Sequence, residues 1–314
     1  MPVMTSTHRA AATGSLEPAT GSGEQVLTVE GLSVTFSTSR GTTHALRGVD
    51  LALRKGQIVG VAGESGSGKT TAALAATGLL ARTAEVDGAI RYDGVDLVSL
   101  PEKKLRRYRG RHLAMIFQET GSALNPVIRV GDQLMMAARA HATKGADVRQ
   151  RVTQALADVR LDDVDRVMRS YPHELSGGMC QRVIIAMALS CGSQVLFADE
   201  PTTALDVSVQ REILDLIRGL VDQRGLAVML ISHDLAVLSE VCDDLVVMYR
   251  GQVVETGPAE AVLRDPGHPY TQALLGCIPT VGGSHEDLRE ITAEQRRLIE
   301  SVDEPVVHGS GGGR

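Results

Sequence analysis

Hydrophobic residues recur along the chain in two kinds of pattern. Between Val26 and Leu53 they alternate with polar residues, as in "VLTVEGLSVTFS", which is typical of half-buried strands. Three later runs, "QIVGVAG", "QVLFADE" and "LAVMLISHD", are mostly apolar and end in glycine or polar residues, so we expect buried strands there. The stretches "TTAALAATGLL" and "VQREILDLIRGLVDQR" predict helices.

The order of these elements predicts the fold. Strands that alternate with helices form a largely parallel sheet with crossover connections. A stretch from about Glu119 to Leu175 has apolar residues three and four positions apart, so we expect a mostly helical insertion there. Beyond Pro258 we expect a shorter appendage. Residues 1–25 are small and polar, and we expect them and the final stretch "VVHGSGGGR" to be disordered.

Composition narrows the class of protein. The chain has 314 residues, of which 43% are hydrophobic and 22% charged, as in ordinary globular proteins with a sizeable core. A net charge of −6 and an aromatic content of 3% argue against a nucleic-acid partner. We expect a cytosolic location, because no apolar run approaches the roughly 20 residues of a membrane span and the N-terminal stretch lacks the apolar core of a signal peptide.

The cysteines do not predict a metal site. Cys180, Cys191, Cys242 and Cys277 form no C-x-x-C pair and have no metal-ligand spacing, so we expect reduced thiols.

The most specific local pattern is "GESGSGKT", from Gly63 to Thr70, which matches G-x-x-x-x-G-K-[ST] in full. Its glycines let backbone amides converge on phosphate groups, Lys69 supplies a positive charge, and the Thr70 hydroxyl can reach Mg²⁺. A strand is predicted before this loop and a helix after it, which is the context that such a phosphate-binding loop requires.

Polar residues at the ends of other strands complete a candidate site. Asp199 and Glu200 follow "VLFA", where Asp199 can hold Mg²⁺ and Glu200 can polarise a water for in-line attack on a phosphate. His233 follows "MLIS", and Gln118 follows "MIF". Ligands of open α/β sheets bind at the carboxyl ends of the strands, so we expect these side chains to lie near the loop.

A second glycine pair lies in "LSGGM", from Leu175 to Met179, at the start of a predicted helix. Backbone N–H groups at a helix N-terminus can bind an anion, so the chain carries two candidate phosphate sites.

Taken in order, these motifs resemble the ATPase subunit of ABC transporters over roughly Val26 to Pro258. The resemblance implies an α/β P-loop NTPase fold, an ABC-type nucleotide-binding domain with a helical subdomain insertion and a short C-terminal appendage. It identifies Gln118 with the Q-loop, Asp199 and Glu200 with the Walker B aspartate and catalytic glutamate, and His233 with the switch histidine.

The resemblance also implies a set of ligand-binding residues. ATP would be bound by Phe36, Gly63, Glu64, Ser65, Gly66, Ser67, Gly68, Lys69, Thr70 and Thr71, with Phe36 stacking on adenine. The resemblance implies Mg²⁺ ligands at Thr70, Gln118 and Asp199. The signature residues that face the other subunit's ATP would be Ser176, Gly177, Gly178 and Gln181, and Asp206 would belong to the D-loop formed by "ALD".

In this family two subunits pack head to tail, so the two glycine-rich stretches would belong to two different ATP sites. "ETGSALNPV", "DEPTTALDVSVQREIL" and "HPYTQALL" further resemble the importer branch for dipeptides, oligopeptides and nickel. Cys180 stands where this branch has arginine, so we expect a local change beside the signature. Cys277 is the lone cysteine of the appendage, so no iron–sulfur cluster is expected.

We therefore expect an ATP-hydrolysing subunit that powers uptake of peptides or a similar solute from the cytoplasmic face of the membrane. The resemblance implies a second ATPase subunit, in a heterodimer rather than a homodimer, two transmembrane permease subunits, and indirectly an extracytoplasmic solute-binding protein. Three alternatives stay open: an exporter ATPase, a soluble ABC ATPase of translation or DNA repair, and an ATP-binding switch that does not hydrolyse.

Overall fold

The computed structural model describes residues 23–38, 41–118, 123–142, 147–203, 205–276, 298–299, 301–302 and 305–309. Of the N-terminal stretch predicted to be disordered, residues 1–25, the first 22 lie outside these ranges, and the prediction is wrong at its end because a strand begins at Gln25. Cys277 and Ala204 of the D-loop stretch also lie outside the described ranges.

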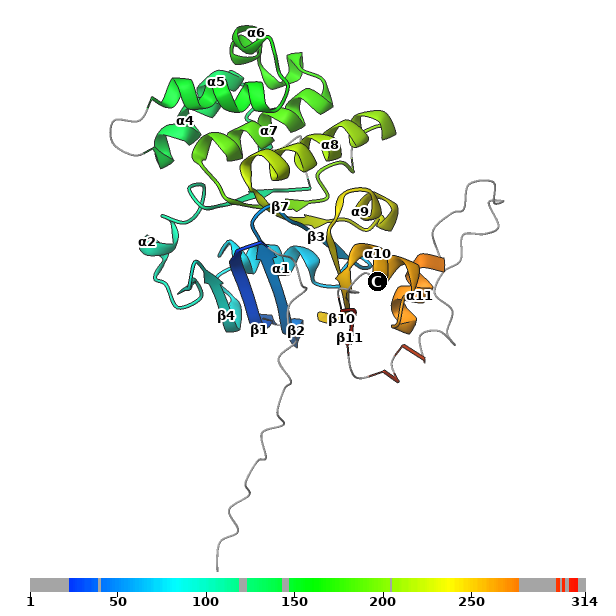
Figure 1. The fold of residues 1–314 in the computed structure, drawn as a ribbon. Helices are drawn as coiled ribbons and strands as arrows, with labels where there is room; N and C mark the ends of the chain where they lie inside the picture. The colour runs from blue at the N-terminus through cyan, green and yellow to red at the C-terminus, as the bar shows by residue number, and fades with distance from the viewer. Residues whose placement is uncertain are drawn as a thin grey trace, which may run out of the picture.

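Two sheets organise the described part of the chain (Figure 1). One has the strand order β2-β1-β4-β5, and its neighbouring strands are antiparallel. Its strands are β1 (Gln25–Thr38), β2 (Gly41–Arg54), β4 (Ala84–Tyr92) and β5 (Val95–Asp96). The first two confirm the predicted strands between Val26 and Leu53, while residues 84–96 carried no prediction.

The second sheet has the order β11-β10-β9-β3-β8-β7-β6. Strands β9, β3, β8, β7 and β6 run parallel, as predicted, and β10 is antiparallel to β9. Its strands are β3 (Ile58–Ala62), β6 (Leu113–Ile116), β7 (Val195–Asp199), β8 (Ala227–Ile231), β9 (Asp244–Tyr249), β10 (Gln252–Pro258) and β11 (Val306–Val307). Every residue of β3, β7 and β8 is buried, which explains why these strands are apolar apart from Asp199 at the end of β7.

The described helices are α1 (Lys69–Ala76), α2 (Glu102–Leu105), α4 (Val130–His141), α5 (Val148–Asp158), α6 (Val164–Arg169), the 3₁₀ turn η1 (Pro172–Glu174), α7 (Gly177–Cys191), α8 (Val207–Arg224), α9 (Leu235–Val241), α10 (Ala259–Arg264) and α11 (Pro269–Gly276). Helices α4 to α8 lie above β7 and β3 in Figure 1, while α1 lies below them. None of the helices in the described ranges has the length and apolar character that a membrane span requires.

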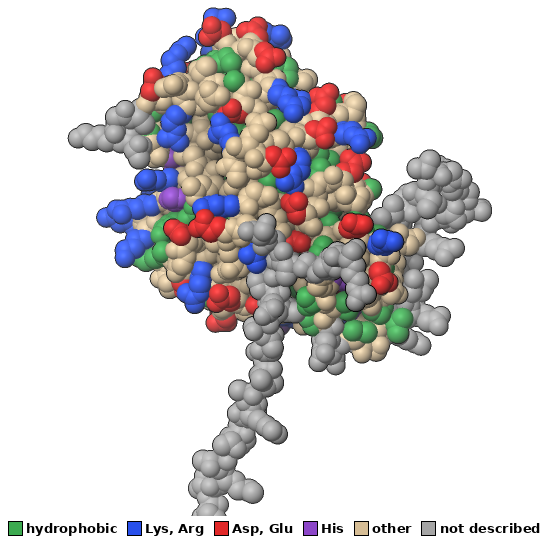
Figure 2. Space-filling model, in the orientation of Figure 1, with side chains coloured by type: hydrophobic (Ala, Val, Ile, Leu, Met, Phe, Trp, Pro, Cys, Tyr) green, Lys and Arg blue, Asp and Glu red, His purple; other side chains and the backbone are tan. Residues whose placement is uncertain are grey.

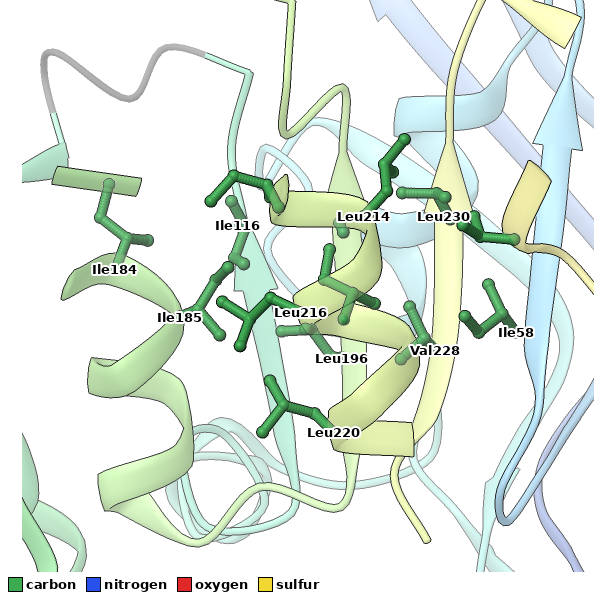
Figure 3. Close-up of a cluster of buried hydrophobic side chains, with 14 of the residues drawn as sticks. Ile58, Ile116, Ile184, Ile185, Leu196, Leu214, Leu216, Leu220, Val228 and Leu230 are labelled. Carbon is green, nitrogen blue, oxygen red and sulfur yellow. The ribbon is translucent and has the colours of Figure 1, made fainter. Parts of the chain in front are cut away.

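The helical layer is larger than the sequence predicted. Helices α4, α5 and α6 lie within the predicted insertion, but α7 packs against both α4 and α5 and so extends this layer past Leu175. The other face of α7 joins α8 and the sheet in one buried cluster, in which Ile185, Leu196, Leu216 and Val228 meet (Figure 3). Burial of this apolar surface, at about 25 cal/mol per Å², fixes the helical layer to the sheet that carries the candidate site.

The C-terminal appendage is joined closely to the rest of the chain. Tyr270 and Val262 are fully buried in the same cluster as the sheet residues. The prediction that "VVHGSGGGR" is disordered is wrong for its first residues, because Val306 and Val307 pair with Glu255 and Thr256 of β10. Backbone pairing with an existing strand edge orders a segment too short to show a strand pattern of its own.

Candidate functional site

The predicted side chains converge at the carboxyl ends of four parallel strands. The loop from Gly63 follows β3, Glu200 follows β7, His233 lies two residues beyond β8 and Gln118 two residues beyond β6. They surround a cavity of about 380 Å³ that is lined by Ala45, Ser65, Gly66, Gly68, Lys69, Thr70, Thr71, Gln118, Glu200, Thr203 and His233.

Left-handed glycines shape the loop. Gly63, Gly66 and Gly68 have φ values of 146°, 80° and 105°, which residues with a Cβ rarely adopt. A Cβ on Gly63 would lie 2.3 Å from the carbonyl oxygen of Met248, and one on Gly68 would lie 2.9 Å from that of Ala45. The backbone of the loop therefore fits tightly against neighbouring strands. Helix α1 begins at Lys69, with Gly68 of the loop as its N-cap.

Lys69 is buried inside the loop that it ends. Its Nζ donates to the carbonyl oxygens of Gly63, at 2.7 Å, and Glu64, at 2.8 Å. Burial lowers the pKa of Lys69, while the carboxylates of Glu200 and Asp199 act in the opposite direction. The ammonium group is thus held where the loop and two acidic side chains meet, which suits a phosphate with bound metal.

Asp199 and Thr70 supply oxygen atoms beside Lys69. Asp199 is 4% exposed and forms a hydrogen bond with Thr70. Burial raises the pKa of Asp199, and the hydrogen bond from Thr70 offsets part of this increase. A carboxylate and a hydroxyl are the oxygen donors that Mg²⁺ prefers, so these residues fit that ion.

Three side chains hold the carboxylate of Glu200. His233 Nδ1 lies 2.8 Å from Oε1, Gln118 Nε2 donates to Oε2 at 3.0 Å, and the Thr203 hydroxyl donates to Oε2 at 2.9 Å. Burial disfavours the charged form and raises the pKa of Glu200, but the hydrogen bonds with His233 and Thr203, together with nearby positive charge including Lys69, hold this pKa below its usual value. Glu200 is therefore ionised and oriented near neutral pH.

The backbone of Glu200 is also unusual. Its φ of 47° lies in the left-handed region, and its N–H donates to the carbonyl oxygen of Ile231 at 2.9 Å. Such conformations cost on the order of 1–3 kcal/mol and persist where surrounding contacts enforce them. The turn directs the side chain out of β7 and toward Gln118 and His233.

The second glycine stretch lies apart from this cavity. Ser176 caps α7, where its hydroxyl accepts from the N–H of Met179 at 3.3 Å, and Asp206 caps α8 in the same way through Val209. A Cβ on Gly178 would lie 2.5 Å from Cγ1 of Val209, so this glycine lets α7 approach α8 closely. Gln181 is fully buried, and its amide has no hydrogen-bond partner among the described residues.

Some residues differ from the sequence prediction. Phe36 does not line the cavity and packs against the hydrophobic cluster of the antiparallel sheet, so its adenine contact stays a prediction. Ala45 and Thr203 line the cavity and were not among the predicted site residues. The hydroxyl of Thr203, three residues after Glu200, could have been predicted from the sequence as a hydrogen-bond donor to that carboxylate. Ala45 has no polar group that would indicate a place in the site.

Comparison with known proteins agrees with this geometry. Residues 46–203 match the family described as ABC transporter, and residues 254–304 match the oligopeptide/dipeptide transporter C-terminal region. The oligopeptide transport ATP-binding protein OppD of Haemophilus influenzae is 41% identical over 277 residues, which are 87% of this chain and 85% of that protein.

The chain belongs to the ABC transporter family of ATPases. OppD of Escherichia coli is 40% identical over 88% of this chain and 82% of its own length. The glutathione import ATP-binding protein of Salmonella typhimurium is 41% identical over 91% of this chain, which spans 46% of that longer protein.

Solved ABC cassettes share the fold. The dimeric ATP-binding cassette MJ0796 bound to ADP and Pi has a TM-score of 0.64 and 26% identity, and the match covers 74% of this chain and 98% of that one. cbiO1 of Clostridium perfringens, part of the ABC transporter complex cbiONQ, has a TM-score of 0.66 and 27% identity over 77% and 91% of the two chains. The predicted fold class is confirmed, and this ABC protein is an ATPase.

Proposed function

We propose that this ABC ATPase powers the import of peptides across a membrane. The observation that carries the proposal is the match of residues 254–304 to the oligopeptide/dipeptide transporter C-terminal region, alongside relatives named as oligopeptide transport ATP-binding proteins. An ATPase domain over residues 26–258 and an appendage over 259–314 are part of this proposal, although the two share one hydrophobic cluster.

Within the site, Glu200 acts as the general base. Its ionised carboxylate accepts a proton from the attacking water, and His233 and Gln118 keep that carboxylate oriented. The loop residues Gly63 to Thr71 bind the phosphates of ATP, and Lys69 neutralises their charge. Thr70, Asp199 and Gln118 would hold Mg²⁺, which supplies further charge neutralisation.

The site needs a second subunit to close. Ser176, Gly177 and Gly178 do not line the cavity of their own chain, and the helix N-terminus at α7 suits a phosphate bound by a facing subunit. We propose a pair of ATPase subunits, a heterodimer, that works with two permease subunits and indirectly with an extracytoplasmic solute-binding protein.

A groove between the sheet and the helical layer is the proposed permease contact. It has a volume of about 500 Å³ and mostly apolar walls from β6, α4 and α7. Leu79 and Phe117, on its lining, are 41% and 46% exposed, which is unusual for large apolar side chains. Phe117 directly precedes Gln118, so a permease segment in this groove is coupled to the residue that orients Glu200.

Cations beside the groove suit a membrane surface. Lys103, Lys104, Arg106, Arg107 and Arg111 are exposed, and no ion pair of theirs lies within the described residues. Figure 2 shows Lys and Arg side chains gathered at the left edge of the molecule, where Figure 1 places α2. Positive charge attracts anionic lipid headgroups, which supports a peripheral location on the cytoplasmic face.

The permease contact can be tested with Phe117→Asp. A carboxylate buried without a partner costs about 2 kcal/mol or more at an interface, so permease binding should weaken at least about tenfold. The measurement is co-purification of the permease subunits with the tagged ATPase. The control is Val95→Asp, which changes an apolar side chain of similar exposure, 39%, on the antiparallel sheet. Normal permease recovery with Phe117→Asp would contradict the assignment of the groove.

A further inference from the structure

The C-terminal appendage reaches the phosphate-binding loop directly. The hydroxyl of Tyr270, in α11, accepts a hydrogen bond from the backbone N–H of Glu64 at 2.9 Å. The two residues are 206 positions apart in the sequence, and the Tyr270 side chain is completely buried. A buried hydrogen bond between a rigid side chain and the second residue of the loop restricts how that loop can move.

Tyr270 is itself held firmly. Its ring lies against that of Tyr249 at the end of β9, with centroids 4.5 Å apart. Its backbone N–H donates to Nδ1 of His268, which is 2% exposed. Strand β9 is the neighbour of β3, so the tyrosine pair is anchored to the strand beside the one that leads into the loop.

A buried carboxylate fastens this segment to the sheet. Glu255 of β10 is fully buried and accepts from the N–H groups of Gly267, at 2.7 Å, and His268, at 3.1 Å. Its Oε1 also lies 2.7 Å from Nε2 of His308, the residue after β11. Polar contacts therefore run from His308 through Glu255 and His268 to Tyr270 and the loop.

Glu64 is held through its backbone carbonyl as well as through its N–H. The carbonyl of Glu64 accepts from Lys69 Nζ, while its N–H is bonded to Tyr270. The preceding residue, Gly63, lies against the Met248 carbonyl with no room for a Cβ. With Glu64 fixed in this way, the amides that follow it are arranged for phosphate before ligand binds, which lowers the ordering cost of binding.

We propose that Tyr270 is a positioning residue of the phosphate-binding loop, through which the C-terminal appendage sets the affinity of the site for ATP. The inference rests on the proposed role of this loop in nucleotide binding. It assigns the appendage a task inside the ATPase site of its own chain.

The test is Tyr270→Phe in the full-length protein, which removes the hydroxyl and keeps the buried ring. We expect the Kd of MgATP, measured by calorimetry, to rise about 3- to 10-fold, because ATP binding would then have to order a loop that the hydrogen bond no longer holds in place. In steady-state ATPase assays the KM for ATP should rise by a similar factor, with kcat at saturating ATP nearly unchanged. A structural role alone would lower the unfolding temperature of the nucleotide-free protein and leave the Kd unchanged.

Tyr249→Phe is the matched control. It removes a hydroxyl from the other ring of the pair and leaves the bond to Glu64 in place, so it should bind MgATP as the wild type does. Provided that the wild type binds MgATP, either of two results would overturn the proposal. One is wild-type affinity in Tyr270→Phe, and the other is an equal loss of affinity in both variants. Failure of the wild type itself to bind MgATP would instead contradict the nucleotide site.

Discussion

At the scale of single residues, Glu200 is the most strongly constrained side chain of the site. Its left-handed backbone, its bond to the Ile231 carbonyl and its contacts with Gln118, Thr203 and His233 all fix the direction of one carboxylate. A general base must be ionised and aimed at its proton, and these contacts favour both conditions.

Glu200→Gln separates binding from chemistry. The amide keeps the shape of the side chain but cannot accept a proton, so hydrolysis should fall by about 10²–10⁴-fold with ATP affinity nearly unchanged. Phosphate release and MgATP binding, measured on the same preparation, check this. Glu260→Gln changes an exposed carboxylate on α10 and should leave both quantities as in the wild type. Normal turnover in Glu200→Gln would give the role of base to another residue, with His233 as the first candidate.

At the scale of elements, the strands that could be predicted from the sequence are those whose own residues are buried in a regular pattern. The runs that became β3 and β8 contain no polar side chain, and β7 is apolar up to its last residue, Asp199. Each strand ends at or beside a predicted residue of the site. Strand β4 was missed because most of its residues are at least partly exposed, which leaves little alternation to read. The bond from Glu64 to Tyr270 could not be predicted, because no local pattern encodes a contact across 206 positions.

The sequence Ser176-Gly177-Gly178 at the start of α7 has a structural role within this chain and a proposed role in binding a nucleotide. Gly178 is needed for close packing of α7 on α8, while Ser176 caps the helix and presents its N-terminus outward. The glycine pair therefore has a structural reason inside this chain, and its proposed contact with a facing nucleotide depends on the surface around Ser176.

Ser176→Arg tests that contact. The bulky side chain blocks close approach of a phosphate, so hydrolysis at the facing subunit's nucleotide should fall by about 10²-fold or more, the effect of losing preorganised donors. Binding of ATP to the subunit's own loop should be retained, because Gly63 to Thr71 are unchanged. ATPase activity of the assembled pair and calorimetry of the single subunit measure the two effects. Ser239→Arg on α9 is the control, and equal activity of both variants would contradict the cross-subunit role.

At the scale of the whole molecule, three regions meet around one sheet. The helical layer and β6 form the groove proposed for the permease, and the strand ends form the proposed ATPase site. The appendage contacts the loop of that site through the hydrogen bond between Glu64 and Tyr270. ATP can drive transport only if it binds one arrangement of the complex more tightly than another. Phe117 lies next to Gln118, which is hydrogen-bonded to Glu200, so the proposed permease groove is joined to the proposed catalytic carboxylate by a route along which that coupling could pass.

We propose that ATP hydrolysis by this chain drives peptide import. The most direct measurement is the accumulation of labelled peptides by lipid vesicles that contain the assembled transporter, with the peptide-binding protein on one side and MgATP on the side of this subunit. We expect accumulation with the wild type and MgATP, and a loss of at least about tenfold with Glu200→Gln. Two results would contradict the proposal. One is equal peptide accumulation with the wild type and with Glu200→Gln, and the other is no accumulation by a wild-type complex that hydrolyses ATP.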